Sequence, residues 1–337
     1  MFAKHLSHTT TAYNAQQMPT FRKTHAQSID LVFTERQRLL AAVLVFIGAI
    51  CFAAKAVMVK LAYRYEVDVV SLLALRMLFS LPFFTVIAWQ AERRAALRGQ
   101  PPLPVHDFLK IGGLGLLGYY FASWFDFMGL QYISAGLERL ILFIYPTLVV
   151  LLSFLLWKKR NSRTQVIALV LTYAGIAVAF LEHLLQSANT NFWLGTLYVF
   201  ISALVFAVYL IGSSEVIPRI GTWRFTPLAM IAATVAILIH HAFSQQWQLF
   251  HFEYEVYVLT LLMAIFATVL PAFLVVEGLR VIGPGNTSII SSVSPVATIV
   301  LANIFLDEQF SYLQWIGTAL VISGVLLTSL QRQAANN

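Results

Sequence analysis

The chain has 337 residues, of which 59% are hydrophobic and only 11% charged, and its formal net charge is +7. Soluble domains carry about 25% charged residues, so these few charges cannot cover a water-exposed surface, and lipid must surround most of the chain. The surplus of Lys and Arg is therefore assigned to cytosolic loops of a membrane protein rather than to nucleic-acid binding. The single cysteine, Cys51, excludes disulfides and cysteine-ligated metal sites.

The polar segment 1–38 is predicted to be a cytosolic arm, and no signal peptide is evident in it. Ten apolar runs follow, each near the roughly 20 residues that a helix needs to cross a bilayer. They cover 39–62, 69–90, 108–130, 134–157 and 164–182 in the first half, and 192–212, 224–243, 255–278, 285–306 and 311–330 in the second. The runs are continuous rather than alternating, which favours helices over strands. The predicted fold is an all-α polytopic membrane protein with ten transmembrane helices.

The basic residues predict the orientation of these helices in the membrane. With the N-terminus in the cytosol, 17 of the 22 Lys and Arg residues fall in the arm, in inner loops or at inner helix ends. Positive residues concentrate on the cytosolic side of membrane proteins. We therefore expect a multi-pass protein of the cytoplasmic (inner) membrane with both termini in the cytosol.

The second half of the chain repeats the first half. The stretch from Gly129, "GLQYISAGLERLILFIYP", matches the stretch from Gly278, "GLRVIGPGNTSIISSVSP", at an offset of 149 residues that continues beyond both stretches. Because each unit holds five spans, the second must enter the membrane from the opposite side, as in inverted-repeat transporters. We predict two repeat domains, 39–183 and 192–330, the second inverted. The basic triplet 158–160 falls at this offset on 307–309, "DEQ".

Further stretches in both halves carry a family pattern: "AAKAVMVKLAYRY", "LLALRMLFSLPFF" and "IISSVSPVATIVLANIFLDEQFSYLQWIGTALVISGVLL". With the repeated stretches, they make the chain resemble the drug/metabolite transporter superfamily, specifically its EamA-like ten-helix carriers, over about residues 39–330. The resemblance implies two inverted five-helix repeats around a central cavity and alternating access. It also implies substrates such as amino acids, sugars, nucleotide sugars or drugs. The "KKR" after the fourth span departs from the acidic residue that many members carry there, whereas Glu308 keeps the acid in the second half.

Five charged residues lie inside the predicted spans with at least four residues between them and either end: Lys55, Arg76, Asp126, Glu138 and Arg139. A charge at a helix centre costs about 2.5–3.5 kcal/mol on insertion scales, so such residues usually face the bundle interior and line a pathway. One interpretation is a substrate pathway in the outer half of the membrane, whose surplus positive charge suits a carboxylate or phosphate. The other is a set of structural ion pairs in which Arg76, Asp126 and Arg139 hold helices together.

Aromatic and hydroxyl side chains at mid-span extend the candidate pathway. Tyr119 and Asp126 share a face of the third span, Glu138 and Tyr145 share a stripe of the fourth, and Ser294 lies in the ninth. For any one of these side chains, packing against its neighbours is the competing interpretation.

Two prolines are the candidate hinges. Pro146 and Pro295 lie within the fourth and ninth spans, where a proline frees a backbone carbonyl and permits bending. His240 and His241 are direct neighbours, so they do not predict a metal site.

The chain contains neither a nucleotide-binding glycine loop nor a nucleophile–base set, so neither an enzyme nor a cofactor is predicted. The predicted function is secondary transport of a small polar metabolite by alternating access, with outward movement of an amino acid or related zwitterion favoured. The alternatives are a carrier for sugar phosphates, nucleotide sugars or drugs, and a non-transporting membrane partner subunit. Energy would come from the substrate gradient, from protons or from a counter-substrate. Asp126 or Glu138 is the candidate proton carrier, because burial favours the neutral form of a carboxyl group; the oligomeric state is not predicted.

Overall fold

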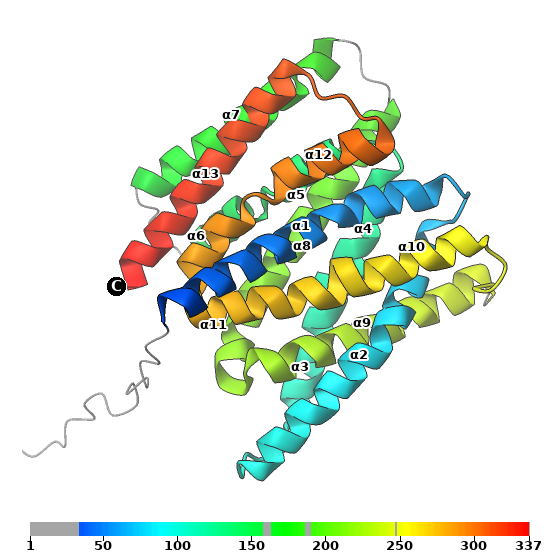
Figure 1. Ribbon diagram of the computed structural model, residues 1–337, viewed down its shortest axis with the longest axis vertical. Helices are drawn as coiled ribbons and strands as arrows, with labels where there is room; N and C mark the ends of the chain where they lie inside the picture. Colours follow the sequence, from blue (N-terminus) through cyan, green and yellow to red (C-terminus); the bar gives the residue numbers. More distant parts are fainter. Residues whose placement is uncertain (1–33, 158–162, 186–189, 247, 337) are drawn as a thin grey trace, which may run out of the picture.

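The computed structural model describes residues 34–157, 163–185, 190–246 and 248–336 (Figure 1). These residues form a helical bundle without a strand, which confirms the predicted all-α class. The first helix begins at the same end of the bundle at which the last helix ends (Figure 1). Most of the predicted arm and the basic triplet 158–160 lie outside the described residues.

The helices of the first half are α1 (Glu35–Tyr63), α2 (Val69–Leu97), α3 (Val105–Gly115), the π-helix η1 (Leu116–Phe121), α4 (Ala122–Leu130), α5 (Ala135–Leu142), α6 (Tyr145–Trp157) and α7 (Arg163–Leu185). Those of the second half are α8 (Thr190–Ile220), α9 (Thr222–Gln245), α10 (Tyr254–Ala264), the π-helix η2 (Ile265–Val269), α11 (Leu270–Ser291), α12 (Ser294–Leu306) and α13 (Tyr312–Asn336). Helix α11 is kinked at Gly283, whose φ of +77° is readily adopted by glycine.

The helices coincide with the ten predicted runs. In the described residues, seven helical segments are long and apolar enough to cross a membrane, and α7 and α13 contain shorter apolar stretches. The remaining run is the α3–η1–α4 segment, whose glycines, tyrosines and charged residues lower its hydropathy. Several helices extend beyond their apolar runs: α2 continues to Leu97, and α1 already begins at Glu35, inside the segment predicted as an arm. There the Thr34 hydroxyl accepts a hydrogen bond from the Gln37 amide, which caps the helix.

The offset of 149 residues recurs in irregular features of the backbone. The π-helix η1 begins at Leu116 and η2 begins at Ile265, the equivalent position. Helices α5 and α11 end at Leu142 and Ser291, again equivalent positions, and α6 and α12 resume three residues later. Because π-turns and breaks are uncommon in helices, their coincidence at one offset shows that the repeat is structural.

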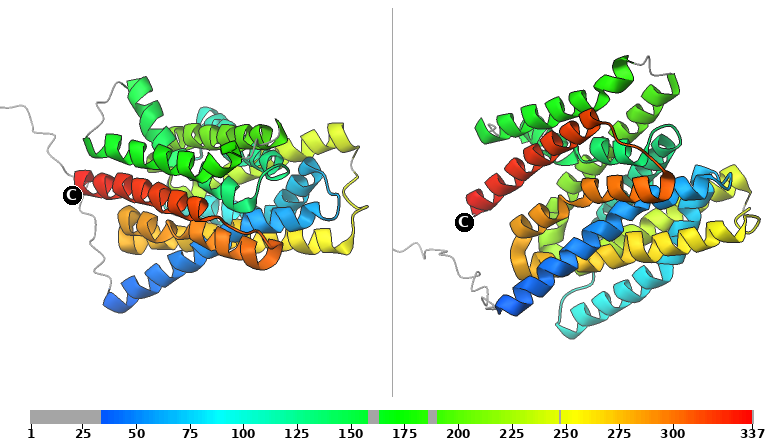
Figure 2. Two further views of the ribbon diagram at one scale, coloured as in Figure 1. Left: turned by 90° about the horizontal axis from the view of Figure 1, so that it is seen from above. Right: turned by 45° about the horizontal axis from the view of Figure 1, so that its top comes forward.

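Contacts between the two halves of the chain are related by an approximate two-fold symmetry, so that equivalent helices make equivalent contacts. Helix α1 packs on α11 and its equivalent α8 packs on α4, whereas α7 packs on its own equivalent, α13 (Figures 1 and 2). In the α7–α13 pair, Gly175 lies on Gly317 and Ala168 lies on Gly324. Residue numbers rise along α7 in the direction in which they fall along α13. These equivalent helices therefore run antiparallel, as an inverted repeat requires.

The two ends of the bundle differ in charge. At one end the described helix ends and loops carry mainly basic residues, among them Arg93, Arg94, Arg98, Arg219 and Arg224; we call it the basic end. At the opposite end, the acidic end, they carry Arg64 with Glu66, Asp68, Glu253, Glu255, Asp307 and Glu308.

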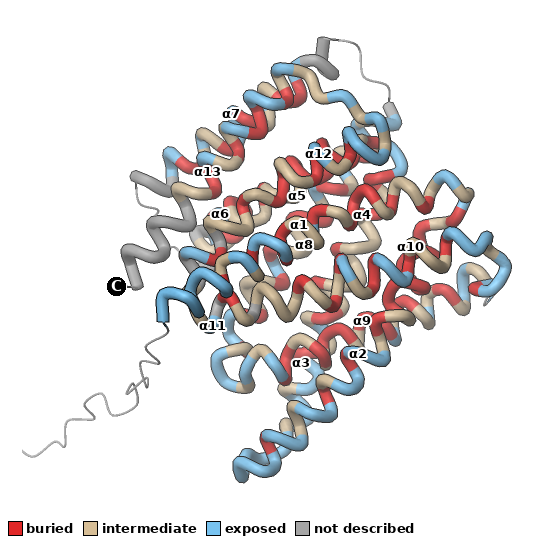
Figure 3. Tube along the Cα trace, viewed as in Figure 1, coloured by how far each residue is buried: buried red, intermediate tan, exposed pale blue. Residues whose placement is uncertain are grey.

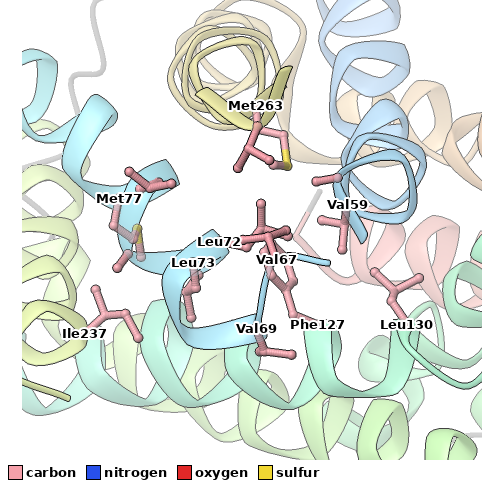
Figure 4. Packing of buried hydrophobic residues seen from close by; sticks show 14 of the residues in the cluster. Val59, Val67, Val69, Leu72, Leu73, Met77, Phe127, Leu130, Ile237 and Met263 are labelled. Carbon is pink, nitrogen blue, oxygen red and sulfur yellow. The ribbon is translucent and has the colours of Figure 1, made fainter. Parts of the chain in front are cut away.

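Apolar residues are both buried in the bundle and exposed on its outside. Outward-facing stretches of the helices are exposed and include large apolar side chains such as Phe46, Trp89 and Ile239 (Figure 3). Lipid can cover such a surface, whereas water would disfavour it. Inside, a cluster that includes Val59, Leu72, Phe127 and Met263 joins α1, α2, α4 and α10 towards the acidic end (Figure 4).

Candidate functional site

A cavity of about 430 Å³ lies at the centre of the bundle, between helices of both halves. Most of its walls are apolar, and the aromatic side chains among them are Phe52, Phe84, Tyr119, Phe143, Tyr145, Phe206, Trp223 and Phe273. Its lining reaches Ile87 on α2 and Thr222 at the start of α9, both near the basic end. A largely apolar cavity with a few grouped polar side chains is the usual form of a small-molecule site.

The charged side chains of the cavity gather at its opposite side, towards the acidic end of the bundle. They are Lys55, Arg76, Asp126 and Arg139, and Glu138 lies directly behind them; we call these five residues the charged cluster. All five are buried. The structure therefore brings together every intramembrane charge that the sequence singles out.

Lys55 on α1 pairs with Asp126 on α4, with 2.5 Å between its Nζ and the carboxylate Oδ2. The same Nζ lies 3.9 Å from Oε1 of Glu138 on α5. Asp126 therefore takes part in an ion pair between helices, as one interpretation of the sequence predicted. Its partner is Lys55, however, and not Arg76 or Arg139. Spacing along the chain does not reveal that α1 packs against α4 and α5 at this depth, whereas the contacts of the folded bundle do.

Arg76 on α2 faces the cavity from the side. Its Nη2 donates a hydrogen bond of 3.2 Å to the Ser123 hydroxyl, and its guanidinium lies 4.9 Å from the centre of the Phe127 ring. Its Nε has no hydrogen-bond partner among the described residues. A buried donor without a partner is costly in a folded protein, so this group is suited to donate a hydrogen bond to a ligand oxygen.

Arg139 fixes the N-terminal part of α5 to two other helices. Its Nε donates to the Thr298 hydroxyl of α12 at 3.1 Å, and its Nη2 donates to the Phe52 carbonyl of α1 at 3.1 Å. The Thr298 hydroxyl in turn donates to the Ala53 carbonyl. Arg139 is thus both a wall residue of the cavity and a structural link.

Glu138 precedes Arg139 but points elsewhere. Its side chain is fully buried, does not line the cavity, and has no hydrogen-bond partner for either oxygen among the described residues. Arg139 Nε is 3.9 Å from its Oε2, so the two neighbours make at most a long ion pair. This long separation agrees with the roughly 100° between adjacent helical positions.

Beyond the cavity, at the acidic end of the bundle, contacts around the start of α5 join neighbouring elements. The Glu308 carboxylate accepts from the Ala135 amide with 3.1 Å to each oxygen, at the positive end of the helix. Lys60 donates to the carbonyls of Leu130 and Ile133 at 3.3 and 2.9 Å. The Phe310 ring packs directly against Gly136, which leaves no room for a side chain there.

The remaining predicted pathway residues divide between the wall and the helix breaks. Tyr119, Tyr145 and Ser294 line the cavity, and the Tyr119 hydroxyl shares a hydrogen bond of 2.9 Å with that of Tyr209. Pro146 and Pro295 do not line it. They lie in the first turns of α6 and α12, directly after the two breaks in the backbone.

Some participants were not singled out from the sequence, namely Phe52 and Thr298. Thr298 follows Ser294 by one helical turn, so the i, i+4 spacing on one face of the ninth span was the available signal. Away from the cavity, Glu277 and Arg280 of α11 form an exposed ion pair at i, i+3 spacing, with 2.5 Å between Nη2 and Oε1.

No group of three or more potential metal ligands occurs in the described parts of the chain. His241 is buried and its Nε2 is 3.0 Å from the Ser71 hydroxyl, while His240 Nδ1 is 2.9 Å from the Tyr120 hydroxyl. Both histidines therefore link α9 to neighbouring helices.

Comparison with known proteins gives one family. The sequence matches the EamA-like transporter family twice, over residues 39–181 and 193–330. It is 27% identical over 290 residues to "Uncharacterized transporter YcbK" of Bacillus subtilis (strain 168), which covers 84% of this chain and 90% of that protein. It is 24% identical to "Uncharacterized transporter YetK" of the same organism, over 70% of this chain and 72% of the relative.

A solved crystal structure resembles the fold with a TM-score of 0.56 and 17% sequence identity. The match covers 89% of this chain and 99% of the other. At this identity the likeness concerns the fold alone.

Proposed function

Because the chain belongs to the EamA-like transporter family, we propose that it exports an amino acid or a related zwitterion across the cytoplasmic membrane by alternating access. The family is one of polytopic membrane transporters rather than enzymes, and the apolar helices agree with a multi-pass protein. The substrate, the direction and the membrane are the parts that we propose.

The observation that carries the substrate class is the placement of opposite charges at one end of an apolar cavity. Arg76 Nε and Asp126 Oδ1 have no hydrogen-bond partner in the part of the chain that the structure describes. The first can donate to a carboxylate, and the second can accept from an ammonium group. The aromatic walls, such as Phe84 and Phe206, suit an apolar side chain. A free amino acid carries all three features within the dimensions of a cavity of about 430 Å³.

The direction rests on which end of the cavity is closed. The contacts of Glu308, Lys60 and Phe310 close the acidic end, whereas the cavity reaches the basic end. If the basic end faces the cytosol, as the charge bias favours, this conformation receives substrate from inside. Breaking the contacts at the acidic end and closing the basic end would then release the substrate outward.

An amphipathic drug-like cation is the second candidate, and the predominance of apolar wall over charge favours it. Such a compound needs Asp126 but has no carboxylate for Arg76. The two candidates therefore differ in whether Arg76 matters.

The test is uptake by proteoliposomes of labelled amino acids, sugar phosphates and a lipophilic cation, by wild type and by Arg76→Gln. For an amino-acid carrier we expect saturable uptake of a few amino acids that the variant reduces strongly. Uptake of the cation alone, unchanged in the variant, would favour the drug carrier. Failure to transport any of them, together with a co-purifying membrane protein, would favour the partner-subunit alternative.

A further inference from the structure

The two carboxyl groups of the charged cluster, those of Asp126 and Glu138, face the same ammonium group. Lys55 Nζ lies 2.5 Å from Asp126 Oδ2 and 3.9 Å from Glu138 Oε1. Asp126 Oδ2 accepts from Lys55, but Asp126 Oδ1 and both oxygens of Glu138 have no partner among the described residues. Buried oxygens of this kind are nearly always hydrogen-bonded in proteins. Two ionised carboxylates beside one ammonium group would also repel each other.

One proton would resolve both difficulties. If Glu138 carries it, its O–H can donate to Asp126 Oδ1, and Asp126 keeps its ion pair with Lys55. Carboxyl pairs elsewhere share a proton for the same physical reason, since two like charges in contact cannot both ionise easily. Building on the proposed function, we propose that Asp126 and Glu138 form a proton-binding site, and that this proton is exchanged for the ammonium group of the substrate.

The surroundings of Glu138 allow both of its charge states. Lys55 of α1 and Arg139 of α5 each place a nitrogen 3.9 Å from a carboxyl oxygen, close enough to favour the ionised form but too far for a hydrogen bond. From α2, Arg76 lines the cavity together with Asp126, and its Nη2 donates to Ser123, one turn before Asp126 on α4.

The other elements around the pair add few ionisable groups. On α1, the Tyr63 hydroxyl donates to the Phe127 carbonyl, and Glu308 lies at the N-terminus of α5. Helices α8 and α12 also pack on α5 and present the uncharged Ser202 and Thr298. The balance between the protonated and the ionised form of Glu138 is therefore set by few groups. Asp126 favours the protonated form, and Lys55 and Arg139 favour the ionised form.

The exchange follows from these contacts. In the proton-loaded state, Glu138 donates to Asp126 Oδ1. When a substrate ammonium reaches Asp126 from the cavity, it takes this oxygen as its acceptor, and the Glu138 proton loses its acceptor. The proton leaves for the water of the cavity, and the Glu138 carboxylate remains between Lys55 and Arg139. One proton thus departs as one ammonium binds, which makes the carrier a proton antiporter.

The sign of the pH dependence follows from this competition. A lower pH fills the site with a proton and opposes substrate binding, whereas a higher pH favours the substrate. With one proton exchanged per zwitterion, a pH gradient should concentrate substrate in the more acidic compartment, by up to about tenfold per pH unit.

The transport test separates this inference from the proposed function. In proteoliposomes with an acidic lumen we expect wild type to accumulate the transported amino acid, and Glu138→Gln to exchange it more weakly and without any response to the pH gradient. The Gln amide can still donate to Asp126, so the variant imitates the protonated state. Exchange without any effect of the gradient in wild type, or accumulation in the alkaline compartment, would overturn the antiport while the carrier function stands. Absence of exchange for every compound would instead count against the proposed function.

A spectroscopic test of the proton site needs no substrate. Infrared spectra of the purified protein at neutral pH should show the C=O stretch of a buried protonated carboxyl group, which disappears in Glu138→Gln. The matched control is Glu255→Gln, which removes an exposed acid at the start of α10 and should leave the band unchanged. If Glu138→Gln does not fold, isotope-labelled glutamate should shift the wild-type band and labelled aspartate should not. Absence of the band in wild type would overturn the proton site.

Discussion

The two repeats share a backbone but differ in chemistry at equivalent positions. The α4–α5 region of the first repeat carries Asp126, Glu138 and Arg139, whereas the equivalent positions of the second are Val275, Thr287 and Ser288. Lys55 and Arg76 likewise correspond to Leu204 and Phe225. All five charges are therefore confined to one repeat.

The break sites show how far the equivalence extends. Both repeats carry a π-helix and a helix break at the same offset, and in both a proline follows the break. Thr287, in place of Glu138, donates to the Gly283 carbonyl of its own helix and makes no ion pair. The side chain of Ser288 lies outside the described residues. Under the proposed function, the duplicated backbone would supply the moving scaffold, and the unduplicated charges would supply the selectivity.

The largest effect is expected from Asp126→Asn. It leaves the buried Lys55 ammonium without its partner, and breaking a buried ion pair in this way costs about 3–5 kcal/mol. The melting temperature in detergent should fall sharply and transport should be lost. The equivalent change in the second repeat, Val275→Ala, should cost far less. Equal destabilisation by the two substitutions would contradict the proposed difference between the two repeats.

A large effect on affinity with little effect on folding is expected from Arg76→Gln. A hydrogen bond to a charged group contributes about 1.5–3 kcal/mol, so KM should rise roughly tenfold or more at an unchanged melting temperature. The KM is measured from the rate of uptake as a function of substrate concentration. An unchanged KM would remove Arg76 from the substrate site and leave it as a packing residue against Phe127.

A moderate effect is expected from Glu308→Gln, which weakens the closure at the acidic end. In a Cys51→Ser background with Ser294→Cys in the cavity, an impermeant thiol reagent supplied from the acidic end should label several times faster in the variant. Asp307→Asn, next to Glu308 but without its bond to Ala135, is the matched control. No difference between the two would show that Glu308 does not hold the acidic end closed.

The smallest effect is expected from Glu277→Gln. It removes the pair with Arg280, which lies at the surface, and exposed pairs contribute about 0–1 kcal/mol. Transport and melting temperature should stay close to wild type. A strong loss of transport would mean that charged residues of the second repeat also take part in transport, in addition to the charged cluster.

The sequence was sufficient for features that depend on local pattern. Span positions follow from continuous hydrophobic runs, and the offset of 149 residues places both π-helices and both breaks once one copy is known. The intramembrane charges could be named because charge is rare in a bilayer.

Pairings across helices could not be predicted. Whether Asp126 meets Lys55 or Arg76 depends on how α1, α2 and α4 rotate and pack, which no local spacing encodes. For the same reason Glu138, expected on a cavity stripe with Tyr145, lies behind the wall: the break between α5 and α6 changes the direction of the stripe between them.

The central claim is that the charges of one repeat form the substrate site on a duplicated scaffold. Its most direct test is substrate exchange in proteoliposomes by Lys55→Ala and by Leu204→Ala, which remove long side chains at equivalent positions of the two repeats. Both proteins must elute as single folded species before they are compared. We predict that Lys55→Ala abolishes exchange and that Leu204→Ala retains most of it. Equal exchange by the two variants would contradict the claim.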